Sequence, residues 1–159
     1  MSTARVSAGV YYVFDPSYIE VFKSDERFLW DCVPKSFSSF YYDNQHIYVW
    51  STNQGPGCYP LYYDGLNLKT KLENIPTDSG KFSLIPKSLF SKLGKELVED
   101  SYPVIFDQDT WIRLSDPKLG DVKIGDYLIV TSGTEPFEEE LNQMVMTHEI
   151  SISDDIYHC

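Results

Sequence analysis

The chain has 159 residues, of which 42% are hydrophobic and 15% aromatic, and this favours one folded domain over a disordered chain. The formal net charge of −11 is unevenly distributed: residues 1–96 carry ten acidic and ten basic side chains, whereas residues 97–159 carry 14 acidic and three basic ones. Direct nucleic-acid binding is not expected, because a phosphate backbone requires a basic surface. The negative charge instead favours a basic protein partner, through long-range attraction, with solubility alone as the alternative explanation.

The N-terminal region predicts two strands. Residues 5–14 (RVSAGVYYVF) form an apolar run that ends at the turn signal Asp15-Pro16-Ser17, and residues 17–23 alternate between two sets of side chains. The opening segment does not resemble a signal peptide, and no apolar run in the sequence reaches the length needed to cross a bilayer. We therefore expect a cytoplasmic protein that does not associate with a membrane.

Two hairpins are predicted in the middle of the chain. Residues 37–42 and 46–51 flank Asp43-Asn44-Gln45, and residues 58–63 and 66–75 flank Asp64-Gly65, a pair that fits a two-residue type I′ turn. Short apolar runs predict further strands at residues 81–85, 102–106, 110–114 and 122–131.

Two helices are predicted. Residues 86–94 begin with a proline and end at a glycine, and residues 135–149 follow Thr134 as N-cap and carry one apolar stripe. The expected fold is strand-dominated α+β: an antiparallel twisted sheet or small sandwich, with one or two short helices packed on it. We expect a single domain over residues 1–159, with frayed ends at 1–4 and 150–159.

The segment STNQGPGCYPLYYDG (51–65) raises the question of a catalytic or phosphate-binding loop. Pro56 removes a backbone amide and no lysine follows before Lys69, so a phosphate loop is not expected. Cys58 could act as a nucleophile if His46 faced it across a hairpin, which would make the protein a cysteine hydrolase. A plain turn between two strands is the interpretation that we favour.

Neither a metal nor a cofactor is expected. The three histidines show no HxH or HExxH spacing, and Asp107-Gln108-Asp109 begins like a calcium loop but lacks its later glycine and glutamate. The three cysteines form no CxxC pair, which predicts reduced thiols at Cys32, Cys58 and Cys159.

Aromatic side chains concentrate in the three strands predicted between residues 37 and 63. Alternate rings on a strand point to opposite faces of the sheet, so one set fills the core. The other set either forms cross-strand pairs, which we favour, or forms an exposed surface that binds a partner. The residues concerned are Phe40, Tyr41, Tyr42, Tyr48, Trp50, Tyr59, Tyr62 and Tyr63.

The predicted function is a non-catalytic acidic module that covers a basic surface on a partner protein, as inhibitors and toxin-immunity proteins do. The alternatives are a viral or cellular assembly component that self-associates through an aromatic sheet face, and the hydrolase based on Cys58. The run Glu138–Glu140 also has a structural explanation, because a helix dipole favours acids near its start. The candidate partner-binding residues are Tyr41, Tyr48, Trp50, Tyr62, Glu138, Glu139, Glu140, Asp154 and Asp155.

Overall fold

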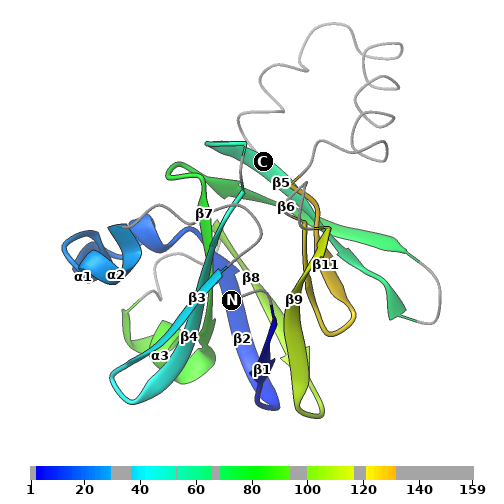
Figure 1. Ribbon diagram of the computed structural model, residues 1–159, viewed down its shortest axis with the longest axis horizontal. Helices are drawn as coiled ribbons and strands as arrows, with labels where there is room; N and C mark the ends of the chain where they lie inside the picture. Colours follow the sequence, from blue (N-terminus) through cyan, green and yellow to red (C-terminus); the bar gives the residue numbers. More distant parts are fainter. Residues whose placement is uncertain are drawn as a thin grey trace, which may run out of the picture.

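A computed structural model describes residues 3–29, 37–52, 54–65, 69–93, 100–116 and 121–131 of the chain. Within these ranges, eleven strands form two antiparallel sheets, and short helices pack on one of them (Figure 1). The predicted strand-dominated α+β fold is thereby confirmed. The predicted helix 135–149 lies outside the described residues.

The first sheet has six strands, and its spatial order differs from the order along the chain. The order is β1 (Thr3–Val6), β9 (Thr110–Asp116), β10 (Asp121–Ile124), β11 (Tyr127–Ile129), β5 (Gly57–Tyr63) and β6 (Thr70–Thr77). All of its pairings are antiparallel. This sheet therefore brings Thr3–Val6, near the start of the chain, beside β9.

The second sheet has five strands and carries the helical segments. Its order is β3 (Phe37–Tyr42), β4 (Gln45–Ser51), β7 (Lys81–Pro86), β2 (Gly9–Phe14) and β8 (Ser101–Phe106). The helical segments are η1 (Pro16–Tyr18), α1 (Glu20–Lys23), α2 (Glu26–Leu29) and α3 (Lys87–Leu93). In Figure 1 the helices lie on one side of this sheet and the six-stranded sheet lies on the other.

Residues Ile47–Trp50 of β4 are buried on both faces of the five-stranded sheet, and the alternation of their side chains explains how. Tyr48 and Trp50 belong to the core cluster between the sheets, whereas Ile47 and Val49 pack in the cluster that includes the helices. Because both faces are covered, β4 contains a continuous apolar run, Ile47–Trp50, instead of alternating apolar and polar residues.

The hairpin predicted around residue 43 is confirmed. β3 and β4 pair from Tyr42 with Gln45 back to Phe37 with Trp50, and Asp43 and Asn44 form the turn with φ angles of 51° and 61°. Two successive positive φ angles are the signature of a type I′ turn. Aspartate and asparagine tolerate this conformation better than most residues do.

The type I′ turn predicted at Asp64-Gly65 is wrong. Tyr63 pairs with Thr70, so six residues and not two connect β5 to β6, and the described part of the predicted strand 66–75 begins to pair only there. A dipeptide with the right composition forms such a turn only if the flanking registers meet next to it.

Two further strand predictions are wrong for local reasons. Residues 17–23 form η1 and α1, because the Asp15 carboxylate accepts a hydrogen bond from the amide of Ser17 and Pro16 occupies a first-turn position, which together start a helical turn. Residues 122–131 form the hairpin β10–β11, because Gly125 adopts a φ of +57° and reverses the chain.

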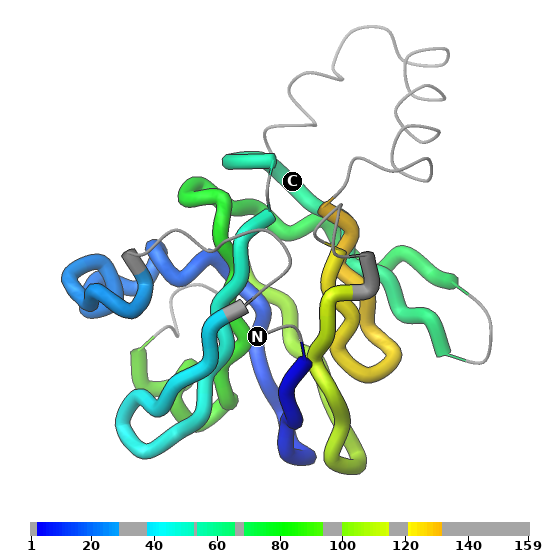
Figure 2. Tube along the Cα trace, in the orientation of Figure 1, coloured from blue at the N-terminus to red at the C-terminus, as the bar shows by residue number. Residues whose placement is uncertain are grey.

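The predicted strand 5–14 is divided between the two sheets. β1 ends at Val6 and pairs with β9, and β2 begins at Gly9 and pairs with β7 and β8. Figure 2 shows the chain turning sharply between these two strands. The turn therefore joins the two layers of the fold.

Candidate functional site

Three of the four aromatic residues predicted to bind a partner lie in the core. Tyr48 is 1% exposed, Trp50 is fully buried and Tyr62 is 5% exposed. The first two point between the sheets, and Tyr62 packs with Leu128 in a smaller buried cluster. Their rings stabilise the fold and present no surface to a partner, which corrects the prediction for these positions.

Tyr41 is exposed, with 66% of its surface accessible. Its ring stacks on that of His46 at 4.8 Å between centroids, and its carbonyl accepts a hydrogen bond from Arg27 Nη1 at 2.8 Å. Glu138, Glu139, Glu140, Asp154 and Asp155 lie outside the described residues. Partner binding by these five acidic residues and by Tyr41 stays a prediction.

The geometry does not favour the Cys58 nucleophile. Cys58 is disulfide-bonded, so the prediction of a reduced thiol is wrong at this position. Its strand β5 belongs to the six-stranded sheet, whereas His46 lies on β4 in the other sheet. The two strands do not face each other across a hairpin, as the hydrolase hypothesis requires. Disulfides are typical of oxidising compartments, so the bond gives the predicted cytoplasmic location no support.

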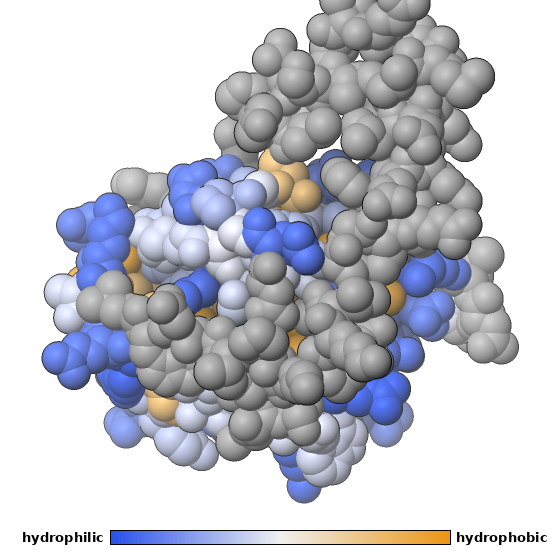
Figure 3. Space-filling model, turned by 45° about the horizontal axis from the view of Figure 1, so that its top comes forward, coloured by the Kyte–Doolittle hydropathy of each residue, from blue (hydrophilic) through white to orange (hydrophobic). Residues whose placement is uncertain are grey.

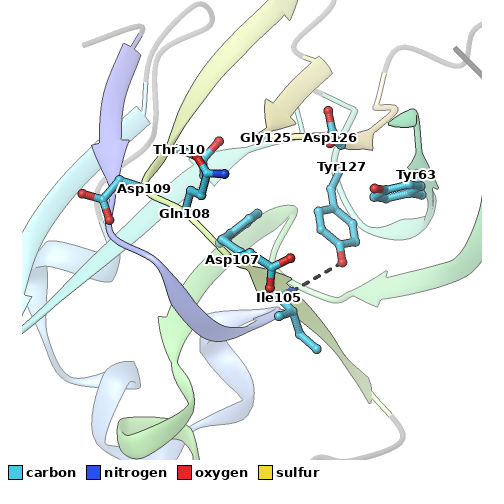
Figure 4. Close-up of a pocket in the computed structure, with 10 residues that line it drawn as sticks. Tyr63, Ile105, Asp107, Gln108, Asp109, Thr110, Gly125, Asp126 and Tyr127 are labelled. Carbon is cyan, nitrogen blue, oxygen red and sulfur yellow. Dashed lines mark hydrogen bonds between the residues drawn. The ribbon is translucent and has the colours of Figure 1, made fainter. Parts of the chain in front are cut away.

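A hollow of about 340 Å³ opens between two turns that follow β8 and β10 (Figure 4). We call it the acidic hollow, because three carboxylates lie around it. Its lining residues are Tyr63, Ile105, Phe106, Asp107, Gln108, Asp109, Thr110, Gly125, Asp126 and Tyr127. They come from both sheets, so only the folded molecule assembles the hollow.

Aromatic rings form one wall of the acidic hollow. Tyr63 and Tyr127 meet edge to face with centroids 5.4 Å apart, and Tyr127 meets Phe106 in the same way at 5.8 Å. Such edge-to-face contacts fix the orientation of the rings. The amide of Ile105 lies 3.4 Å from the hydroxyl oxygen of Tyr127 and donates to it, which further anchors this ring (Figure 4).

The three carboxylates differ in their hydrogen-bond and ion-pair partners. Asp109 accepts a hydrogen bond from the amide of Ala8 at 2.8 Å and pairs with Arg5, and these contacts hold the pKa of its carboxyl below the usual range. Asp107 and Asp126 are exposed, and no hydrogen bond or ion pair from the described residues reaches either carboxylate. Two of the three carboxylates are therefore available to a ligand.

The arrangement suits an organic cation. Aromatic faces attract ammonium and guanidinium groups, and ionised carboxylates accept hydrogen bonds from them. In the part of the chain that the structure describes, no group of three His, Cys, Asp or Glu side chains is arranged to hold a metal ion. Carboxylates beside ring faces thus favour a lysine or arginine side chain over a bare metal.

In the sequence, Asp107 and Asp109 resemble only the start of a calcium loop, and no pattern predicted a site at Tyr63, Asp126 and Tyr127. A signal for the last two was present, because Gly125-Asp126 inside the apolar run 122–131 is a typical hairpin turn. Nothing local in the sequence connects these residues to Tyr63, which lies on a strand far away along the chain.

No protein-family model, curated protein sequence or solved structure matches this chain. The described residues contain no helix whose length and hydrophobicity would let it cross a membrane. The function must therefore be argued from the site itself.

Proposed function

We propose that the protein is a non-catalytic binding module whose acidic hollow receives a lysine or arginine side chain from the basic surface of a partner protein. The observation that carries this proposal is the Tyr63–Tyr127 ring pair beside Asp107 and Asp126, whose carboxylates are engaged by no group of the described residues. An inhibitor or toxin-immunity protein would cover its target in this way.

Exposed apolar side chains support the location of the interface. Among the described residues, five large hydrophobic side chains are exposed: Val21, Tyr41, Tyr63, Ile105 and Trp111. Tyr63 and Ile105 line the acidic hollow, and Trp111 lies on the strand that starts at Thr110, another lining residue. Aromatic residues in such positions commonly dominate binding energy at protein interfaces.

The binding free energy expected for one basic side chain in the acidic hollow is small. A cation over an exposed ring contributes about 0.5–1 kcal/mol, and an exposed ion pair adds about 0.2–1 kcal/mol. Together these contributions reach about 2 kcal/mol at most, so a single basic side chain should bind with a Kd of about 30 mM or weaker. The net charge of −11 would raise the rate of association with a basic protein. Tight binding requires the wider interface.

The surface gives less support to the alternative of self-assembly through an aromatic face. The rings of Tyr48, Trp50 and Tyr62 are buried in the core, so they are not available for self-association. On the face shown in Figure 3, the hydrophobic colour of the described residues occurs in small separate spots. A sheet face that assembles copies of a protein usually presents a continuous apolar area.

The proposal is tested by titrating three probe peptides into isotope-labelled protein and following amide chemical shifts. The probes are acetyl-Gly-Arg-Gly-amide, acetyl-Gly-Lys-Gly-amide and the uncharged control with norleucine at the centre. We expect the two cationic peptides to shift the amides of Asp107, Gly125 and Tyr127 increasingly with concentration, and the norleucine peptide to cause much smaller shifts at the same concentrations.

Matched variants complete the test. The double variant Asp107→Asn/Asp126→Asn should weaken the cationic peptides about three- to tenfold, from the loss of two exposed charge pairs. Glu26→Gln, an exposed acid on α2, should leave the affinity unchanged. Equal binding of the norleucine peptide, or no effect of the double variant, would refute the proposal.

A further inference from the structure

A second hollow, of about 470 Å³, adjoins the acidic one. Its lining residues are Thr3, Thr110, Trp111, Arg113, Lys123, Gly125 and Asp126. Thr110, Gly125 and Asp126 line both hollows, so these three residues form the ridge between them. We call this second site the Trp111 hollow.

The register of the six-stranded sheet explains why two cations and an indole gather there. Arg113 on β9 is paired with Thr3 on β1 and with Lys123 on β10, and residues paired across strands point to the same face. Trp111 lies two residues before Arg113, so it also points to that face. Ile112, between them, points into the core and is fully buried.

The charge of the Trp111 hollow is opposite to that of the rest of its region. Residues 97–159 contain only three basic side chains, and two of them, Arg113 and Lys123, line this hollow. Arg113 is exposed, and no described residue forms a hydrogen bond or ion pair with its guanidinium. Lys123 Nζ lies 3.8 Å from Asp64 Oδ2, a long contact that leaves it able to bind a second anion.

The Trp111 hollow has an exposed indole against which a ligand can pack, and a backbone hydrogen bond joins this residue to the neighbouring turn. The side chain of Trp111 is 56% exposed, and its carbonyl accepts a hydrogen bond from the amide of Gly125 at 3.0 Å. A Cβ at position 125 would come within 2.9 Å of Thr110 Oγ1. Glycine at this position therefore lets the turn pack closely against β9. The turn at Gly125, which lines both hollows, is therefore tied to β9.

We propose that the Trp111 hollow binds an acidic side chain of the partner, next to the basic side chain that occupies the acidic hollow. This inference rests on the proposed function of the acidic hollow. It adds a sequence motif of the partner that the two hollows together would recognise. An extended segment places side chains i and i+2 on the same face, so the recognised motif is a basic residue, any residue, and an acidic residue. Arg113 forms an ion pair with the carboxylate of the partner's acidic side chain. The indole of Trp111 packs against the aliphatic part of that same side chain.

The experiment uses three matched peptides on the full-length protein. They are acetyl-Gly-Arg-Ser-Glu-Gly-amide, the same peptide with glutamine in place of glutamate, and the same peptide with norleucine in place of arginine. We expect the arginine–glutamate peptide to bind about three- to tenfold more tightly than the arginine–glutamine peptide, from one charge-assisted hydrogen-bonded pair. The indole N–H signal of Trp111, assigned with Trp111→Phe, should shift only with the glutamate peptides.

A variant separates this inference from a general charge effect. Arg113→Gln should remove the advantage of glutamate over glutamine while leaving the affinity of the arginine–glutamine peptide unchanged within twofold. Lys87→Gln removes an equal charge from α3, on the opposite side of the five-stranded sheet, and should preserve the advantage. Thermal unfolding of both variants checks that they remain folded.

The outcomes distinguish the two proposals. If the arginine–glutamine peptide binds but glutamate adds no affinity, the inference about the Trp111 hollow is overturned and the proposed function stands. If the norleucine–glutamate peptide binds as tightly as the arginine–glutamate peptide, the acidic hollow contributes nothing and the proposed function fails.

Discussion

The hydroxyl of Ser79 donates a hydrogen bond to Asp15 Oδ1 at 2.7 Å, which joins the end of β2 to the turn between β6 and β7. Asp15 is completely buried, and its carboxylate also accepts hydrogen bonds from the amides of Ser17, Asp78 and Ser79 and from the hydroxyl of Thr77. A buried carboxylate surrounded by donors is stable only while those donors stay in place. Asp15 therefore binds the turn that connects the two sheets, between β6 and β7, to the start of η1.

This contact predicts a large loss of stability for Asp15→Ala. The substitution leaves buried amides and hydroxyls without an acceptor, and we expect it to lower the free energy of unfolding by about 3–4 kcal/mol. Ser79→Ala removes one donor only and should cost about 1 kcal/mol. Urea unfolding measures both values. A loss below that of Ser79→Ala would show that the network does not hold the turn.

The environment of His46 predicts a pH dependence of stability. Burial lowers the pKa of His46 below its ordinary value of 6.5, and its ring lies against those of Tyr41 and Tyr48. Because the unfolded chain takes up the proton first, stability is unaffected above pH 6.5 and decreases as the pH falls from there through the lowered pKa.

The measurement compares the protein with His46→Phe, which keeps a flat ring and cannot be protonated. Urea unfolding at pH 7.5 and pH 5.5 should give a larger decrease for the protein than for the variant. The difference between them isolates His46 from the other titrating groups. Identical pH dependence in the two proteins would mean that His46 protonates as easily in the folded state as in the unfolded one.

The disulfide bond of Cys58 predicts the outcome of thiol counting. The sequence has three cysteines, so unfolded protein without reductant should show one free thiol, and reduced protein should show three. Reduction should also lower the free energy of unfolding by about 2–4 kcal/mol, because the bond restricts the unfolded chain. Three thiols before reduction would contradict the bond. Two thiols with a covalent dimer on a non-reducing gel would show that it joins two chains.

Local signals were reliable where a short segment contained everything that its structure needs. The β3–β4 hairpin was predicted because two apolar runs flank Asp43-Asn44, two residues that accept positive φ angles. The helix α3 was predicted from a proline before its first turn and a glycine after its last described residue. Residues 17–23 were predicted wrongly because their alternation was weighed above another local signal, the Asp15 cap followed by Pro16, which starts a helical turn.

The composition and the runs of apolar residues were enough to determine a strand-rich α+β fold, since burial of alternating side chains requires sheets whatever their order. Which of the aromatic rings are exposed and which are buried depends on the tertiary structure. Helices cover one face of β4 and the six-stranded sheet covers the other, so Tyr48 and Trp50 are buried on a strand that by itself has two equivalent faces. The two hollows arise in the same way, because the sheet pairing brings Thr3, Tyr63 and Tyr127 to the turns at Asp107 and Gly125.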